Sequence, residues 1–278
     1  MKAVITAAGR DHRQLPLQTV TDARGYPTSL LRVQIQDLSA AGVKEIGVVI
    51  NPGDAELFRE SAGDLGDRLT FLPQEKPLGF GHAVALAEEF VGTEDFILSV
   101  GDHLFVSDNP DRNCFQQIIE ASQRLGGPVA ALQPTHESEI TRFGTVGGER
   151  IEGSTDSLRI ECVIEKPTPT VAEQQLFVSG LKSGYYYCFF GIHVLPAAIF
   201  PVLRRAIDAA PAGCPASLTD AFSLWIAENT LHGFAVEGRR FDLEARFGLL
   251  QSQIAMALRS RHRDEVLTTL VELIADRG

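Results

Sequence analysis

KAVITAAG, residues 2–9, is a short, largely apolar run with β-branched residues that ends in three small ones. A run of this kind predicts a buried strand that leads into a tight turn. Apolar residues then recur at near-helical spacing over residues 30–41, and residues 45–50 again have the composition of a strand. The opening of the chain therefore predicts a strand, helix, strand unit.

The same alternation continues along the first part of the chain. The patterns predict helices over residues 54–62 and 82–90 and strands over residues 69–72 and 96–100. Strands that alternate with helices form a parallel sheet covered by helices, and ligands bind at the carboxyl ends of such strands. We therefore predict an α/β fold with a Rossmann-like mixed, mostly parallel sheet flanked by helices.

The second half of the chain changes in character. Strands are predicted over residues 158–164 and 185–195, and helical patterns return after them. A continuous helix-like stretch over residues 248–275 closes the chain. We see no internal repeat, low-complexity segment or linker, so the predicted organisation is one α/β domain over residues 1–247 with a C-terminal helical extension over residues 248–278.

The charge balance excludes one class of partner. The chain has 278 residues, a formal net charge of −11 and a pI near 5.1. Proteins that bind nucleic acid usually concentrate Lys and Arg on one face, so binding to nucleic acid is not expected. Any phosphate-bearing partner is expected to be a small molecule that is held locally.

Cysteine spacing and hydropathy set the expected compartment. The four cysteines lie far apart without a C-x-x-C pair, so neither a zinc site nor a dense disulfide framework is indicated. The apolar run after Met1-Lys2 is too short for a signal sequence, and no later run approaches the length of a membrane span. We expect a cytoplasmic protein that does not bind a membrane, and the sequence leaves open whether it forms a homo-oligomer.

Short motifs occur in a fixed order along almost the whole chain. In the first half they are Ala7-Ala8-Gly9 followed by Arg13 and Pro16, Gly25-Tyr26-Pro27, Gln74 with the GFGHAV run of residues 79–84, and Gly101-Asp102. In the second half they are Phe143-Gly144, Glu165-Lys166-Pro167, Gly191 to Phe200, Leu218-Thr219-Asp220-Ala221, and Arg240-Phe241-Asp242 through Gly248. This order and spacing resemble those of sugar-1-phosphate nucleotidyltransferases, in particular the UTP:glucose-1-phosphate uridylyltransferases (UDP-glucose pyrophosphorylases).

The resemblance implies a reaction in which a sugar-1-phosphate oxygen attacks the α-phosphorus of UTP and pyrophosphate leaves. Charge accumulates on the phosphoryl oxygens, so cations, backbone donors and a divalent metal matter more than a protein nucleophile. The family pattern implies Mg²⁺ as cofactor with Asp102 and Asp242 as its ligands, and oxygen ligands are those that Mg²⁺ prefers. It further implies catalytic roles for Arg13 and Lys166, with Lys166 on the sugar phosphate.

The resemblance also assigns residues to the nucleotide. Gln74, Gly79 and Gly81 are similar to the uracil-binding loop, in which an amide reads the edge of the base and glycine lets the backbone approach closely. Ala8 and Gly9 are implied to complete the nucleotide site. Without the resemblance, the glycines also fit an ordinary turn before a helix.

A separate pair of residues is implied to hold the sugar. Glu165 would bind sugar hydroxyls, and Gly191 would bring its backbone against the sugar ring. Taken alone, Glu165 fits a surface turn before a proline and Gly191 fits a β-bulge.

The chain departs from the family pattern where a triphosphate should bind. Asp11-His12 replace a Gly-Thr pair, which places a carboxylate where backbone amides should face phosphate. The loop over residues 19–27 is short and lacks a family lysine, for which Arg24 or Lys76 would have to substitute. Further along, Glu244 replaces a glycine and Arg246 stands in for a lysine.

Two functions remain in competition. One is a working uridylyltransferase, which the intact Asp102, Asp242 and Glu165-Lys166 motifs favour. The other is a catalytically weakened homologue that binds a sugar nucleotide in a regulatory or scaffolding role, which the altered first loop favours. A glycosyltransferase has little support because no D-x-D motif follows the strand over residues 96–100. We favour the enzyme.

Overall fold

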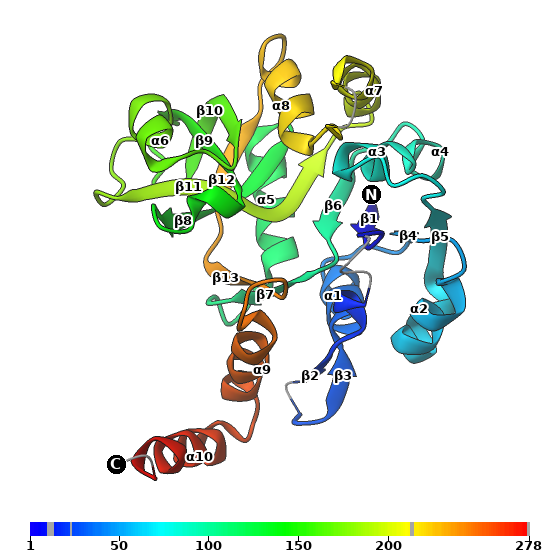
Figure 1. Ribbon diagram of the computed structural model, residues 1–278, viewed down its shortest axis with the longest axis vertical. Helices are drawn as coiled ribbons and strands as arrows, with labels where there is room; N and C mark the ends of the chain where they lie inside the picture. Colours follow the sequence, from blue (N-terminus) through cyan, green and yellow to red (C-terminus); the bar gives the residue numbers. More distant parts are fainter. Residues whose placement is uncertain (10–13, 23, 212–213, 277–278) are drawn as a thin grey trace.

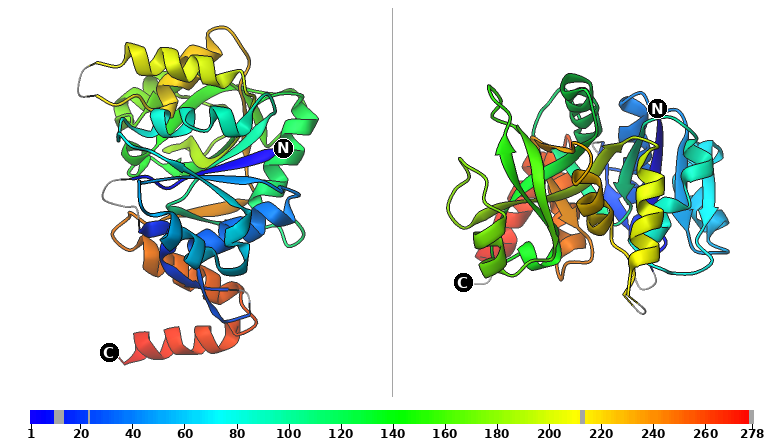
Figure 2. Two further views of the ribbon diagram at one scale, coloured as in Figure 1. Left: turned by 90° about the vertical axis from the view of Figure 1, so that its right-hand side faces the viewer. Right: turned by 90° about the horizontal axis from the view of Figure 1, so that it is seen from above.

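The computed structural model describes residues 1–9, 14–22, 24–211 and 214–276. A mixed sheet of nine strands lies at its centre, in the order β5-β4-β1-β6-β11-β8-β12-β10-β9. Helices lie on both sides of the sheet (Figures 1 and 2). The predicted α/β class with a mixed sheet and a helical C-terminal region is confirmed.

The strands of the central sheet are mostly short. They are β1 (Lys2–Thr6), β4 (Ile46–Ile50), β5 (Leu69–Pro73), β6 (Phe96–Val100), β8 (Val129–His136), β9 (Gly144–Arg150), β10 (Ser157–Glu165), β11 (Tyr185–Leu195) and β12 (His232–Ala235). Two smaller sheets pair β2 (Thr19–Thr21) with β3 (Pro27–Ser29), and β7 (His103–Ser107) with β13 (Gly238–Asp242).

The helices fall between these strands and after them. They are α1 (Leu30–Ala40), α2 (Ala55–Ala62), α3 (Phe80–Ala85), α4 (Glu88–Val91), α5 (Cys114–Leu125), α6 (Pro169–Gln175), α7 (Ile199–Ala209), α8 (Leu218–Ile226), α9 (Gly248–Arg259) and α10 (Arg263–Ala275). Short 3-10 turns cover Leu15–Leu17, Gly63–Arg68 and Ile140–Arg142.

Parallel pairing joins the first four strands of the sheet. β5, β4, β1 and β6 run side by side in the same direction, with Thr6 opposite Val49 on one neighbour and Val100 on the other. Their carboxyl ends therefore meet at one edge of the sheet. The loop after β1, Gln74 after β5 and Gly101-Asp102 after β6 all leave from this edge.

Antiparallel pairing dominates the other half of the sheet. β11 runs antiparallel to β6, β8 and β9, and β10 runs antiparallel to β12 and β9, while β12 and β8 are parallel. The sheet therefore contains less parallel pairing than the sequence predicted. The reason is that β11 and β10 run opposite to the strands beside them.

Two apolar layers hold the sheet between helices. Along β1, Val4 packs into the cluster that contains α3, α7 and α8, whereas Ala3 and Ile5 pack into the cluster that contains α1, α2 and α5. All three side chains are fully buried. A strand buried on both faces explains the nearly continuous apolar run at the start of the chain.

Two predicted helices are each divided in the structure. The stretch over residues 82–90 forms the end of α3 and then α4, and the predicted single helix over residues 248–275 is two helices, α9 and α10. The second break lies at Ser260, whose backbone is extended (ψ 165°) and whose hydroxyl accepts a hydrogen bond from the His262 N–H (3.1 Å). A side chain that binds the backbone locally competes with helix continuation.

The two C-terminal helices differ in how they contact the rest of the molecule. α9 packs Leu249, Ala255 and Met256 against an apolar cluster that includes Val20 and Leu104. α10 buries no residue and projects away from the sheet (Figures 1 and 2). No helix in the described part of the chain has both the length and the apolar character to cross a membrane.

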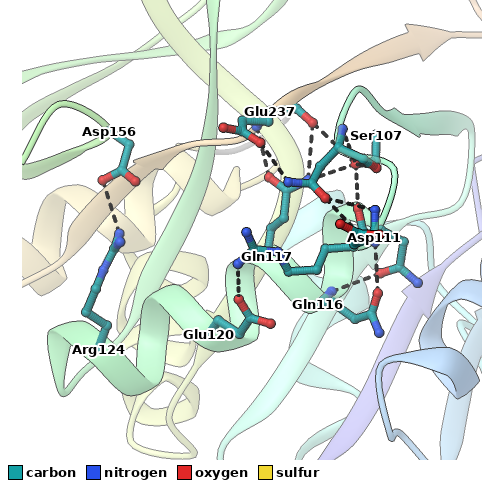
Figure 3. A network of polar contacts seen from close by, with 11 residues as sticks. Ser107, Asp111, Gln116, Gln117, Glu120, Arg124, Asp156 and Glu237 are labelled. Carbon is teal, nitrogen blue, oxygen red and sulfur yellow. Dashed lines mark hydrogen bonds and ion pairs between the residues drawn. The ribbon is translucent and has the colours of Figure 1, made fainter.

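A buried polar network fixes the small β7–β13 sheet against α5 (Figure 3). Gln117 of α5 donates from Nε2 to Ser107 Oγ (2.9 Å) and to the Glu237 carbonyl (3.1 Å), and its Oε1 accepts from the Glu237 N–H (2.9 Å). Ser107 Oγ also donates to the Arg112 carbonyl (2.6 Å). The network holds one end of a sheet whose other end carries His103 opposite Asp242.

Candidate active site

A cleft of about 490 Å³ lies at the carboxyl edge of the parallel strands. Its lining comes from both halves of the chain, from the loops after β1, β5 and β6, from β11, and from the start of α8. Eight of the sequence-predicted site residues line it: Ala8, Gly9, Gln74, Gly79, Asp102, Glu165, Lys166 and Gly191. The fold thus brings together predicted site residues that are up to 183 positions apart, since Ala8 and Gly191 share the cleft.

One part of the cleft is formed by the segment between β5 and α3. The Gln74 side chain is buried (5% exposed), and its Nε2 lies 3.2 Å from the Gly79 carbonyl and 2.9 Å from His82 Nδ1. Gly79 has φ +101°, and a Cβ there would lie 2.5 Å from Pro215 Cβ. Glycine is therefore required at this turn by both conformation and space.

Gly81 lies beside the cleft and does not line it. Its N–H donates to the Ala216 carbonyl (3.1 Å), and a Cβ there would lie 3.0 Å from the same oxygen. Of the two glycines that the resemblance assigned to the nucleotide, the structure therefore places Gly79 on the cleft and gives Gly81 a packing position between α3 and the segment before α8.

Asp102 leaves β6 on a short turn and faces the cleft with a partner. Its Oδ1 lies 2.7 Å from His103 Nδ1, and the two side chains are 30% and 14% exposed respectively. Burial raises the pKa of Asp102, but the charge and hydrogen bond of His103, together with hydrogen bonds from the backbone and the Glu244 side chain, outweigh it, so the pKa of this carboxyl lies below its usual value. Asp102 is therefore ionised at neutral pH.

Asp242 lies at the end of β13, next to the same turn. The Leu243 N–H donates to the Asp102 carbonyl (3.1 Å), which ties the two segments together. The Asp242 carboxylate accepts from the Arg142 guanidinium through Oδ2 and from the Glu244 N–H (2.8 Å) through Oδ1. Arg142 and Glu244 line the cleft, whereas Asp242 does not.

This arrangement can be tested against the needs of Mg²⁺. Mg²⁺ is commonly held by one or two carboxylates together with substrate phosphates, and no group of three or more His, Cys, Asp or Glu in the described residues is arranged to hold a metal. The ionised, partly exposed Asp102 fits such an ion. Asp242 has a suitable donor set, but its carboxylate is already bound by Arg142, which would compete with a metal ion.

Another part of the cleft carries a carboxylate and an ammonium on successive residues. Glu165 ends β10 and accepts a hydrogen bond from Thr219 Oγ1 of α8 (2.5 Å). Lys166 follows with φ 47°, the only positive φ of a non-glycine residue in the described part of the chain. A left-handed lysine is unfavourable, and conformations of this kind concentrate at functional sites. Both side chains are exposed to the cleft.

The floor of the cleft comes from a bulge in β11. The pairing of β11 with β8 is irregular between Phe189 and His193, and Gly191 within it has φ +99°. His193 is 2% exposed and lies with its ring 5.3 Å from those of Phe189 and Phe222. Its Nδ1 has no partner among the described residues, and burial lowers the pKa of His193 to about 3, so it is neutral.

Comparison with known proteins assigns the family. The model of the family described as "Nucleotidyl transferase" matches residues 2–235, most of the chain. The chain belongs to this family. The match ends before Asp242, so this carboxylate lies outside the part of the chain that the family model covers.

Relatives and solved structures agree with this membership. The chain is 25% identical over 301 residues to UTP–glucose-1-phosphate uridylyltransferase YngB of Bacillus subtilis (98% of this chain, 95% of the relative). It is 25% identical over 297 residues to a UTP–glucose-1-phosphate uridylyltransferase of Staphylococcus epidermidis (98% and 97%). Its fold is similar to that of a UTP-bound UGPase from Acinetobacter baumannii (TM-score 0.74, 20% identity, 97% and 98% coverage). It is also similar to that of a UDP-glucose pyrophosphorylase complexed with UDP-glucose (TM-score 0.73, 19% identity, 91% and 97% coverage).

The first loop of this nucleotidyl transferase is only partly described. Arg13 and the unusual Asp11-His12 pair lie outside the described residues, so their predicted roles stay predictions. Arg24, which the short loop offers in place of the family lysine, lines a separate surface hollow near α1 and does not line the cleft.

Sequence reasoning missed several cleft residues of this nucleotidyl transferase. Those whose contacts matter most are His103, Arg142, His193 and Thr219. Thr219 and His193 lie inside two of the sequence motifs, and His103 and Arg142 directly adjoin two others, so all four lay in or beside a motif. The role of Arg142 could still not be predicted, because its partner Asp242 is 100 residues away.

Proposed function

We propose that this nucleotidyl transferase transfers a uridylyl group from UTP to glucose 1-phosphate, or to a closely related sugar 1-phosphate, and releases pyrophosphate. The observation that carries the proposal is that one cleft contains the Gln74–Gly79 turn, the carboxylate of Asp102 and the Glu165-Lys166 pair. The names of the relatives support UTP and glucose 1-phosphate as the substrates.

The reaction requires little covalent participation by the protein. A phosphate oxygen of the sugar phosphate forms a bond to the α-phosphorus of UTP, and the bond between that phosphorus and the bridging oxygen to the β-phosphate breaks. The electron pair leaves with pyrophosphate. Positioning and charge neutralisation therefore account for most of the catalysis.

The chain's own residues divide these tasks. Lys166 presents an ammonium to the sugar phosphate and reduces the repulsion between the two phosphate groups. Glu165, held by Thr219, accepts hydrogen bonds from sugar hydroxyls. Asp102 and Asp242 would hold Mg²⁺, and the ion would supply positive charge to the phosphoryl oxygens. Arg142 lines the cleft and offers a second cation to the phosphates.

The alternative, a catalytically weakened homologue in a regulatory or scaffolding role, rests on the altered first loop alone. None of the relatives named above is described as a regulatory or scaffolding protein. Asp102, the candidate metal ligand, is a group that a protein which only binds a sugar nucleotide has less need of than a working transferase.

One experiment separates these functions. Pyrophosphate release is measured with UTP, glucose 1-phosphate and Mg²⁺, and UDP-glucose binding to the same preparation is measured by calorimetry. Turnover together with binding is the expected result. Binding at roughly millimolar or lower concentration without turnover supports the alternative function, and absence of both contradicts the assignment of the cleft.

A further inference from the structure

The orientation of the Gln74 amide is determined by two neighbours. The Gly79 carbonyl (3.2 Å) can only accept a hydrogen bond, so the atom that faces it must be the amide nitrogen. The opposite orientation would place two oxygen lone pairs against each other. The second N–H of the same nitrogen points to His82 Nδ1 (2.9 Å).

These contacts also define the state of His82. Because Gln74 donates, His82 Nδ1 must accept, which requires a neutral imidazole with its proton on Nε2. Burial lowers the pKa of His82 and so favours the neutral ring at pH 7. The ring is half-buried at the start of α3, on an element that the Gly81–Ala216 contact holds in place.

The consequence is that only one polar atom of the Gln74 side chain, Oε1, is left for a ligand. Both N–H groups are used within the protein, Oε1 accepts no hydrogen bond from any described residue, and it is not sealed from solvent. Gln74 lines the cleft. The amide therefore offers an acceptor and no donor.

An acceptor in this position discriminates between pyrimidines. Uracil and thymine carry an N–H at ring position 3, which donates to a carbonyl oxygen, whereas cytosine carries an unprotonated nitrogen there, which repels it. A site that matches a substrate N–H rejects an analogue that lacks it more strongly than an apolar site rejects a change in size.

We propose that His82 is a positioning residue that holds the Gln74 amide with its oxygen toward the cleft, and so selects uracil-type over cytosine-type nucleotides. The inference rests on the proposed function, in that the base of the nucleotide is taken to contact Gln74. It adds His82 as the residue that makes Gln74 present an acceptor rather than a donor to the base.

The test compares UDP and CDP as ligands, with dissociation constants measured by calorimetry. The wild-type protein is expected to bind UDP at least tenfold more tightly than CDP. His82→Leu removes the acceptor and frees the amide to turn, so the preference is expected to fall to about threefold or less, mainly through weaker UDP binding. His82→Asn provides a side-chain oxygen in place of Nδ1 and is expected to restore most of the preference.

A matched control separates this effect from the general cost of removing a half-buried histidine. His232 is half-buried outside the cleft, and its Nδ1 has no partner among the described residues, so His232→Leu is expected to leave the UDP:CDP ratio unchanged. Thermal melts check that each variant is folded.

The outcomes distinguish this inference from the proposed function. A wild-type preference that persists in a folded His82→Leu variant overturns the role of His82, even if the enzyme turns over UTP. A preference that collapses in His82→Leu and returns in His82→Asn supports the role, even in a preparation without turnover. A wild-type protein that binds neither nucleotide contradicts both.

Discussion

Asp102 and Asp242 meet at neighbouring turns but differ in their partners. Asp102 is paired with His103 and faces the cleft, whereas Asp242 is bound by Arg142 and by the backbone of Glu244. Both oxygens of Asp242 are engaged, one by a guanidinium and one by a backbone N–H, and Asp242 does not line the cleft, so Mg²⁺ would have to displace more at Asp242 than at Asp102. We infer that Asp102 makes the larger contribution to metal affinity.

Asparagine at either position is expected to reduce uridylyl transfer by roughly 100-fold or more, because several kcal/mol of charge stabilisation are lost with the metal. Asp102→Asn should also weaken Mg²⁺ activation more than Asp242→Asn. Rates are measured over a Mg²⁺ titration. Asp95→Asn is the control, since Asp95 is an exposed carboxylate just before β6, at the opposite end of that strand from Asp102.

Unchanged activity in either variant would remove that residue from the metal site. Thermal melts within a few degrees of the wild type would show that the fold is intact, as expected for nearly isosteric substitutions at the end of a sheet.

The bulge in β11 is the element that brings backbone to the floor of the cleft. Gly191 there has a positive φ, and a Cβ would lie 2.7 Å from Val100 Cγ2 of β6. Gly53, in the turn after β4, has a similar φ of +86° with nothing within 4 Å of its Cβ position. Both glycines therefore need a positive φ, but a side chain would meet a close neighbour only at Gly191.

Gly191→Ala is expected to destabilise the protein by about 1 kcal/mol more than Gly53→Ala, because both incur the left-handed penalty and only the former must displace the Val100 side chain. Urea unfolding measures the difference. The Gly191 variant alone should also raise the KM for the sugar phosphate. Equal losses of stability in the two variants would show that the Val100 side chain can move away without a loss of free energy.

Asp37 of α1 gives the contact between α1 and α9 a dependence on pH. Burial raises the pKa of Asp37 to about 7, against a smaller opposing effect of Arg259 on α9. The folded protein therefore holds this proton more tightly than the unfolded chain. The stabilising contribution is complete below pH about 4 and is lost as the pH rises from about 4 to about 7.

Asp37→Asn is accordingly expected to raise the melting temperature more at pH 8 than at pH 5. The upper limit of the gain is about 4 kcal/mol, at 1.36 kcal/mol per pKa unit, and the incomplete burial of the side chain reduces it. Asp95→Asn should show no such dependence. A gain that is the same at both pH values would mean that Asp37 is ionised throughout.

In the molecule as a whole, the two C-terminal helices contribute unequally to stability. α9 packs on an apolar cluster, and Arg259 donates to the Ser107 carbonyl, whereas α10 buries no residue and exposes Val271, Leu273 and Ile274 by 60–74%. Of the two helices, α10 is therefore the one with less packing to lose. The predicted division at residue 247/248 remains a prediction.

A chain that ends after Arg261 is expected to melt within about 3 °C of the full chain, since less than about 1 kcal/mol of packing is lost. A chain that ends after Phe247 should melt at least about 10 °C lower. If removal of α10 alone has the larger effect, α10 has a partner surface in solution that a single chain does not show.

Much of this architecture could be predicted from the sequence because it depends on local order. Apolar periodicity predicted β1, α1, β4 and β6, and the alternation of strands and helices placed the turn after β6 at the ligand-binding edge. Most motif residues that line the cleft end or follow strands or begin helices, so their local placement depends on short-range geometry, whereas Gly191 lies within β11.

The contacts that give the cleft its chemistry were decided by the tertiary structure alone. Arg142 meets Asp242 across 100 residues, and Thr219 meets Glu165 across 54. Antiparallel pairing in the second half of the sheet likewise depends on which strands become neighbours after the chain has turned back. Local periodicity records which face of an element is buried, but not which distant element covers it, because that choice is made by the packing of the whole core.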